Sequence, residues 1–123
     1  MLENNADPGD TLRRRKGPIW HKGYYLGGNS VLHITPEKGA HISSVEEFSA
    51  GKEVIAEPQP RASQYITMTR AFEELRGQRP YNYWSNNCEH MLNRILYGKN
   101  QSETLVVIVS AMLTTFIVVY SRS

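Results

Sequence analysis

The sequence predicts an α+β fold in which an antiparallel β-sheet packs on helices, followed by a C-terminal transmembrane helix. Aromatic and β-branched runs separated by turn residues over 19–35 predict strands. Apolar residues at helical spacing over 64–76 and 88–96 predict helices, and an uncharged apolar run over 105–120 predicts the membrane span. Because the chain has 123 residues, the part before this run can form one hydrophobic core but not a second domain.

The chain begins with a polar turn and a basic segment. Asp7 to Asp10 includes Pro and Gly and predicts a turn, and Thr11 to Lys16 predicts an edge strand. This strand ends in four consecutive cations, Arg13, Arg14, Arg15 and Lys16. They are explained either by a solvated edge that resists aggregation or by contact with anionic lipid headgroups, if the chain is membrane-bound. The polar start over 1–7 lacks the features of a secretory signal, so we expect a cytosolic domain.

Residues 19–26 and 31–35 predict a β-hairpin, because glycine, asparagine and serine lie between them. The loop length decides where its histidines lie, since side chains alternate between faces along a strand. A three-residue loop, Gly27 to Asn29, would place His21 and His33 on one face as diagonal neighbours. A two-residue loop would separate them.

Three further elements follow the hairpin. Residues 44–48 predict a short helix capped by Ser44, and 53–57 predict a strand that Pro58 ends. Residues 64–76 predict a helix whose apolar stripe faces the core. This stripe comprises Tyr65, Met68, Phe72 and Leu75.

The one cysteine lies at the start of the last helix predicted before the apolar run. Asn86 and Asn87 are good N-cap residues, and Cys88 begins a helical pattern that Gly98 ends. The positive end of the helix dipole favours a thiolate by only about 0.3–1 kcal/mol, so a nucleophilic cysteine needs a second activator, usually histidine. The alternative is a buried cysteine that acts as a small hydrophobe.

His21 and His33 are the histidines that a rigid hairpin could present to Cys88. His90 is a weaker candidate because it lies two residues from Cys88 on the same helix and points about 200° away around the axis. His41 has no apolar or glycine-rich frame, and we expect it at the surface. The sequence contains no paired metal-ligand spacing such as C-x-x-C or H-x-x-x-H, so we expect neither a metal nor another cofactor.

Composition limits the classes of partner. A net charge of +2 is too small to argue for nucleic acid. A single cysteine cannot form an internal disulfide, which fits a reducing compartment. The oligomeric state is open.

The run from Leu105 to Tyr120 contains no charge, glycine or proline. As a helix it would rise about 24 Å, less than the roughly 30 Å of the hydrocarbon core, so flanking residues or local thinning must contribute. We expect a single-pass C-terminal membrane anchor that leaves the larger domain facing the cytoplasm. The alternative is a buried or interfacial helix.

Several motifs occur together in the domain. They are Pro8-Gly9-Asp10, His21 ahead of Gly23-Tyr24-Tyr25-Leu26-Gly27, His33 on the returning strand, and Asn87-Cys88-Glu89-His90-Met91 at a helix start. With these motifs the chain resembles the lecithin retinol acyltransferase-like family, including the H-Ras-like suppressor phospholipases and acyltransferases. Met91 replaces the usual Phe, and Lys22 stands where some relatives have Trp.

The resemblance implies a circularly permuted papain-like catalytic domain over 1–100, a short linker over 101–104 and the anchor over 105–120. It also implies that Cys88 attacks an acyl ester of a phospholipid, that His21 acts as base and then acid, and that His33 orients His21. The resulting thioester would pass its acyl group to water or to an amine or hydroxyl acceptor. The alternatives are a papain-like amidase or peptidase, and a non-catalytic membrane adaptor.

Overall fold

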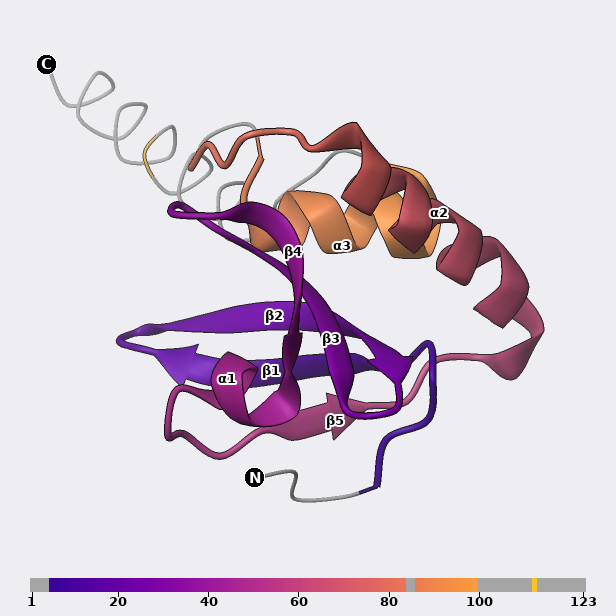
Figure 1. The fold of residues 1–123 in the computed structure, drawn as a ribbon, viewed down its shortest axis with the longest axis horizontal. Helices are drawn as coiled ribbons and strands as arrows, with labels where there is room; N and C mark the ends of the chain where they lie inside the picture. Colours follow the sequence, from indigo (N-terminus) through magenta and orange to yellow (C-terminus); the bar gives the residue numbers. More distant parts are fainter. Residues whose placement is uncertain (1–4, 84–85, 100–111, 113–123) are drawn as a thin grey trace, which may run out of the picture.

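Five antiparallel strands form one sheet in the computed structural model, which describes residues 5–83, 86–99 and 112 (Figure 1). The strands are β1 (Thr11–Lys16), β2 (Ile19–Gly27), β3 (Ser30–Thr35), β4 (Gly39–Ser44) and β5 (Ile55–Glu57), in the order β4-β3-β2-β1-β5. The helices are α1 (Val45–Ser49), the 3₁₀ helix η1 (Arg61–Ser63), α2 (Gln64–Gly77) and α3 (Cys88–Tyr97). The predicted α+β arrangement of an antiparallel sheet packed on helices is confirmed.

The predicted membrane anchor over 105–120 lies outside the described residues, apart from Met112. Within the described part of the chain, no helix is both long enough and apolar enough to cross a bilayer.

The β2–β3 turn is shorter than the loop expected to place both histidines on one face. Gly28 and Asn29 alone separate the paired residues Gly27 and Ser30. Both turn residues have positive φ, 55° and 64°, as in the type I′ turns that suit the twist of a hairpin. With a perfectly regular ladder, this two-residue turn would have separated the histidines.

A β-bulge next to the turn restores the register that the histidines need. The ladder shifts between Tyr25 and Gly27, so Leu26 is the extra residue on β2. Beyond the bulge, Tyr25 pairs with Val31, which is the register expected from a three-residue loop. His21 and His33 therefore lie on one face, the arrangement expected from the three-residue loop, although the turn itself has two residues.

The sheet opens between β2 and β3 beyond the bulge. Their paired residues end at Tyr24 and Leu32, whereas β2 continues back to Ile19 and pairs there with β1 alone. The backbone of β2 before Tyr24 is thus free of β3 on that side. The start of α3 approaches β2 in this opening, as the contact of Cys88 with Trp20 described below shows.

Two hydrophobic clusters fill the two faces of the sheet. Because successive residues of β3 alternate, Leu32 and Ile34 face α2 and α3, whereas Val31 faces α1. Figure 1 shows α2 and α3 together over one face. The first cluster comprises Tyr24, Leu32, Ile34, Ala40, Ala71, Met91, Leu92 and Ile95, and the second comprises Leu12, Val31, Val45, Phe48 and Val54.

Two expectations about the sheet were wrong. Thr11 to Arg13 pair with β5, so the first half of β1 is internal rather than an edge. Strand β4, which had not been predicted, pairs with β3 along its length and brings His41 opposite His33. Its sequence, GAHISS, lacks the aromatic and β-branched run that signals a strand, and pairing with β3 overrides that weak propensity.

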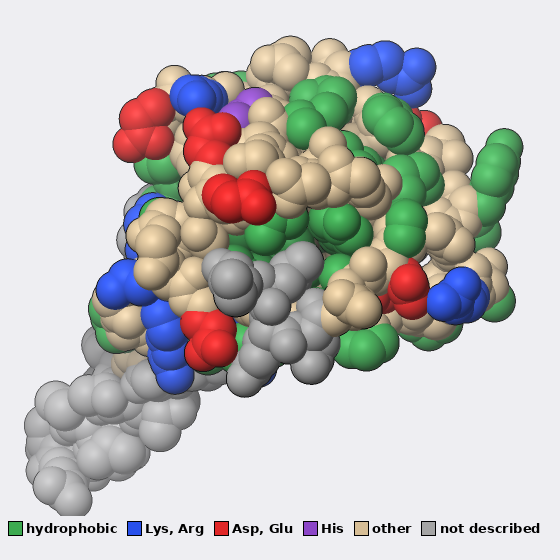
Figure 2. Space-filling view, turned by 60° about the horizontal axis from the view of Figure 1, so that its bottom comes forward, with side chains coloured by type: hydrophobic (Ala, Val, Ile, Leu, Met, Phe, Trp, Pro, Cys, Tyr) green, Lys and Arg blue, Asp and Glu red, His purple; other side chains and the backbone are tan. Residues whose placement is uncertain are grey.

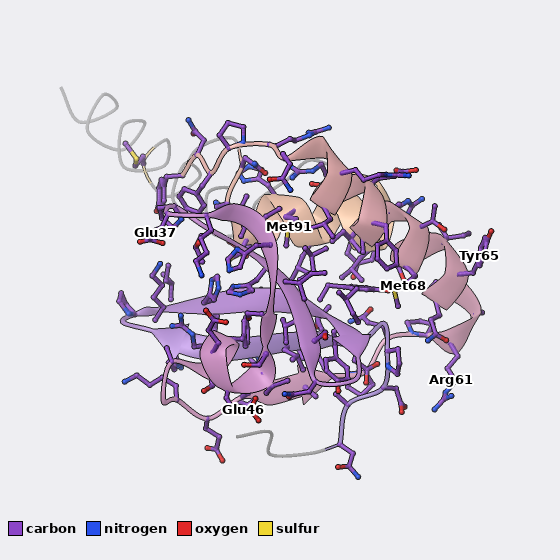
Figure 3. The ribbon with its side chains drawn as sticks, viewed as in Figure 1. Glu37, Glu46, Arg61, Tyr65, Met68 and Met91 are labelled. Atoms are coloured by element: carbon purple, nitrogen blue, oxygen red, sulfur yellow. The ribbon has the colours of Figure 1, made fainter. Side chains whose placement is uncertain are left out.

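Helix α2 packs half of its predicted apolar stripe on the core, because Met68 and Leu75 contact the first cluster. Thr67 and Ala71 are buried, whereas Tyr65 is 84% exposed and Phe72 is 47% exposed. The Thr67 hydroxyl lies 2.9 Å from the hydroxyl of Tyr24, in a buried bond between the helix and the sheet. In Figure 3 Tyr65 projects away from the body of the molecule. Figure 2 shows one face on which hydrophobic side chains reach the surface between charged ones.

Substitution of Gly23 tests how tightly Val31 and Phe48 pack next to the histidines. A Cβ atom on Gly23 would lie 2.7 Å from Val31 Cγ1 and 3.0 Å from Phe48 Cε2, so Gly23→Ala should lower the free energy of unfolding by about 1–3 kcal/mol. The matched control is Gly77→Ala, where nothing lies within 4 Å and alanine favours the helix. Urea denaturation of both variants measures the difference. Equal stability of the two would contradict this packing.

Candidate active site

Cys88 is the first residue of α3, and the cap before it explains why the helix begins there. The Asn87 side chain accepts hydrogen bonds from the backbone N–H groups of Glu89 and His90, at 2.9 and 3.1 Å. The ring of His90 in turn accepts from the backbone N–H of Asn87 at 3.1 Å, which completes a capping box. His90 therefore helps to fix the start of the helix, in agreement with its low rank as a partner of Cys88.

The two hairpin histidines form a buried pair. Nε2 of His21 lies 3.0 Å from Nδ1 of His33, and the side chains are only 4% and 5% exposed. Phe48 of α1 stacks on His21 with ring centroids 5.3 Å apart and meets His33 edge-on at 5.2 Å. Because Nε2 of His21 is used in this bond, Nδ1 is the ring nitrogen left for another group.

The hydrogen bonds continue from His33 to the edge strand β4. Nε2 of His33 lies 2.8 Å from the hydroxyl of Ser43, and that hydroxyl donates to the carbonyl of Ser44 at 3.0 Å. His41 lies beside this row, with its ring 4.3 Å from that of His33 and its Nδ1 on the carbonyl of Gly39 at 2.8 Å. The expectation that His41 is a surface residue was wrong, because β4 holds it half-buried against His33.

The thiol of Cys88 lies against the β2 backbone on both sides of His21. Its Sγ is 3.9 Å from the carbonyl oxygen of Trp20, and a backbone hydrogen bond from Lys22 also reaches it. These groups are accessible because β3 does not pair with this part of β2. The structure therefore bonds His21 to His33 and brings Cys88 to the backbone of β2, the strand that carries His21. In this geometry the thiol donates to the carbonyl oxygen of Trp20 and not to the His21 ring.

Burial dominates the protonation of the three groups. It raises the pKa of the Cys88 thiol, against a smaller opposing effect of the Lys22 backbone bond. It also lowers the pKa of His21 to about 3, with further lowering by His33 and Arg14, and it lowers the pKa of His33 to about 3. The expected preference for a thiolate is thus outweighed, and the resting pair is a thiol beside a neutral imidazole.

The basic segment divides between the two faces of the sheet. Arg14 lies opposite His21, and its Nε donates to the carbonyl of Phe48 at 2.8 Å. Arg13 and Arg15 lie on the other face, with guanidinium carbons 4.2 and 4.1 Å from the centroid of the Trp20 ring. Arg14 therefore belongs to the surroundings of the histidines and not to an outer basic surface.

A hollow of about 120 Å³ lies beside α3 and is lined by Glu89, the residue that follows Cys88. Lys22 and Glu89, which form an ion pair at 3.6 Å, stand at the hollow together with Leu92 and Leu96. A second hollow of about 140 Å³ lies near the Pro8–Gly9 turn, and none of the candidate residues lines it. None of Cys88, His21 and His33 lines the hollow beside α3 either, and it is linked to the thiol through Lys22 and through Glu89, the residue that follows Cys88.

Sequence reasoning missed Ser43, Phe48 and Arg14 as neighbours of the histidines. Arg14 could have been found by pairing β1 with β2, because strand pairing sets it opposite His21. Ser43 could have been found only with β4 in place, where it lies diagonal to His33.

Titration of the histidine pair should make the fold sensitive to acid. Their ordinary pKa is 6.5 and their folded pKa is about 3, so the unfolded chain binds more protons between these values. Stability should be complete above pH 6.5 and fall as the pH drops, by up to about 1.4 kcal/mol per pH unit for each histidine. Urea denaturation from pH 7 to pH 4 measures this slope. The double variant His21→Asn/His33→Asn should flatten it, and an unchanged slope would contradict the assignment.

Two curated proteins are similar to this chain. Lecithin retinol acyltransferase of Homo sapiens is 25% identical over 124 residues, and that of Bos taurus is 26% identical over 124 residues. Each match covers 73% of this chain and 54% of the relative, so the chain spans about half the length of these proteins. No family model matches the chain. The matches agree with the resemblance drawn from the motifs.

Proposed function

We propose, on the premise that this chain is lecithin retinol acyltransferase-like, that it is a cysteine-dependent acyltransferase with phospholipase A-type activity. The observation that carries the proposal is the buried bond between His21 and His33, on a strand whose backbone next to His21 also contacts the thiol of Cys88. A thiol, a base and a group that orients the base form the minimal machinery of a cysteine nucleophile. We further propose a circularly permuted papain-like arrangement of the domain.

The first half of the reaction loads the acyl group onto Cys88. The thiol turns from the Trp20 carbonyl toward His21, and Nδ1 of His21 takes its proton as Sγ attacks the ester carbonyl. The ester C–O bond then breaks, and the protonated His21 returns the proton to the leaving oxygen of the lysolipid. A thioester on Cys88 and a neutral His21 remain.

The second half releases the acyl group. Water, an amine or a hydroxyl attacks the thioester while His21 takes its proton and passes it to the departing sulfur. Water as acceptor gives phospholipase activity, and an amine or hydroxyl lipid gives acyl transfer. Because burial keeps both His21 and Cys88 neutral at rest, His21 acts here as a general base during attack.

The start of α3 supports the negative oxygen that forms in both steps. The Asn87 side chain occupies the N–H groups of Glu89 and His90, which leaves the N–H of Cys88 for the developing oxyanion. The helix dipole adds to this stabilisation at the same point.

The substrate would be a lipid in the membrane that holds the enzyme. An anchor over 105–120 would keep the domain at that membrane and raise the local concentration of lipid, with the domain facing the cytoplasm. Arg13 and Arg15, which flank Trp20, offer a mixed cationic and aromatic surface for anionic headgroups, with Arg13 also paired to Glu57 at 2.8 Å, whereas the exposed Lys16 lies on the face of Arg14. Arg14, which the sequence grouped with them, is turned toward Phe48 instead.

Vesicles of phosphatidylcholine with a radiolabelled acyl chain test the proposal. Cys88→Ala should abolish both release and transfer of the label, and His21→Ala should lower the rate about 10²- to 10⁴-fold through loss of the base. The control is His41→Asn, which removes a nearby ring that is not bonded to His21 or Cys88 and should keep the rate within a few-fold.

Full activity in Cys88→Ala would refute the proposal. Release of amine from acyl amides or peptides without turnover of phospholipid would replace it with a papain-like amidase or peptidase. Turnover of neither substrate class would favour the membrane adaptor.

A further inference from the structure

In the row of hydrogen bonds from His21 through His33 to Ser43, the donor and the acceptor of each bond can be assigned. A serine hydroxyl carries one hydrogen, and that of Ser43 donates it to the carbonyl of Ser44 at 3.0 Å. Its oxygen can therefore only accept from Nε2 of His33, which lies 2.8 Å away. A neutral imidazole carries one N–H, so Nδ1 of His33 must be the unprotonated nitrogen.

The same logic fixes the tautomer of His21. Unprotonated Nδ1 of His33 lies 3.0 Å from Nε2 of His21, so Nε2 of His21 must be the donor. Nδ1 of a neutral His21 is then the nitrogen with a free lone pair, and this is the nitrogen that His33 leaves available for another group.

If the donors and acceptors in this row were reversed, His21 could not act as a base toward Cys88. If the Ser43 hydroxyl donated to Nε2 of His33, Nδ1 of His33 would carry the proton and donate to Nε2 of His21. The proton of His21 would then lie on Nδ1, where no lone pair remains to accept the proton of a thiol. A wrong histidine tautomer costs catalytic triads orders of magnitude in rate.

We propose that Ser43 is a positioning residue that sets the tautomers of His33 and His21 and so exposes Nδ1 of His21 as a base. The catalytic part of this inference rests on the proposed function, whereas the tautomer assignment does not. No proton moves along the row during the reaction. When His21 becomes protonated it keeps Nε2–H on His33 and only gains a proton at Nδ1.

The surroundings of Ser43 indicate that its hydroxyl determines which ring nitrogen of His33 carries the proton. It is 6% exposed, so water competes little for its hydroxyl. His41 is engaged elsewhere, because its Nδ1 donates to the carbonyl of Gly39 at 2.8 Å. The carbonyl of Ser44 can only accept, so it draws the hydroxyl hydrogen of Ser43 away from His33.

Nitrogen-15 NMR of the full chain in detergent micelles, with ¹⁵N-labelled histidine, reads the tautomers directly. The wild type should show Nε2–H on both His21 and His33 at pH 7. Ser43→Ala should give a mixture in which Nδ1–H of His21 becomes detectable, and kcat/KM for phosphatidylcholine should fall about ten- to hundredfold with little change in KM. Ser43→Thr keeps a hydroxyl at the same place and should restore both signals and rate.

The matched control is Ser49→Ala, because Ser49 is also buried and donates to a backbone carbonyl but has no bond to a histidine. It should lower stability as Ser43→Ala does while the tautomers stay unchanged. If Ser43→Ala leaves His21 wholly as Nε2–H, the inference is overturned whether or not the chain is an enzyme. If the tautomers change as expected and no variant or wild-type chain turns over lipid, the proposed function fails and the assignment of Ser43 stands.

Discussion

The hydrogen bond between His21 and His33 is the constraint on which the rest of the site depends. It joins two strands that are no longer paired at that point, and its 3.0 Å length requires both rings to lie on one face of the sheet. The bulge at Leu26 supplies that register despite a two-residue turn. The absence of β3 from the backbone of β2 before Tyr24 gives Cys88 access to the strand that carries His21. A straight, fully paired hairpin would provide neither feature.

Burial gives this bond its chemical character. Phe48 covers both rings, and the low dielectric keeps them neutral, as it keeps the thiol of Cys88 protonated. The helix dipole contributes under one pKa unit and cannot offset this desolvation. The side chains of Cys88, His21 and His33 are therefore all uncharged at rest. In the proposed mechanism, proton transfer from Cys88 to His21 creates the charge only when an ester carbonyl is present for the sulfur to attack.

The sequence alone predicted the features that depend on residues close together along the chain. The Asn87 cap and the start of α3 at Cys88 follow from local spacing. For His21 and His33, spacing allowed either a shared or a separate face, and the bulge at Leu26 decides it. Features that depend on tertiary packing could not be predicted from the sequence. Strand β4 has weak propensity and forms because β3 offers a partner, so Ser43 could not be placed. The stripe of α2 was half right, because Met68 and Leu75 pack on the core, whereas Tyr65 and Phe72 are exposed and the buried positions are Thr67 and Ala71.

The central claim is that Cys88 carries the acyl group, and intact-mass spectrometry tests it most directly. The full chain is incubated briefly with phosphatidylcholine vesicles, quenched in acid and weighed. The account predicts a mass increase of one acyl group, located on Cys88 by peptide mapping, removed by neutral hydroxylamine and missing from Cys88→Ala. An acyl group on another residue, or lysolipid formation at the wild-type rate by Cys88→Ala, would contradict it.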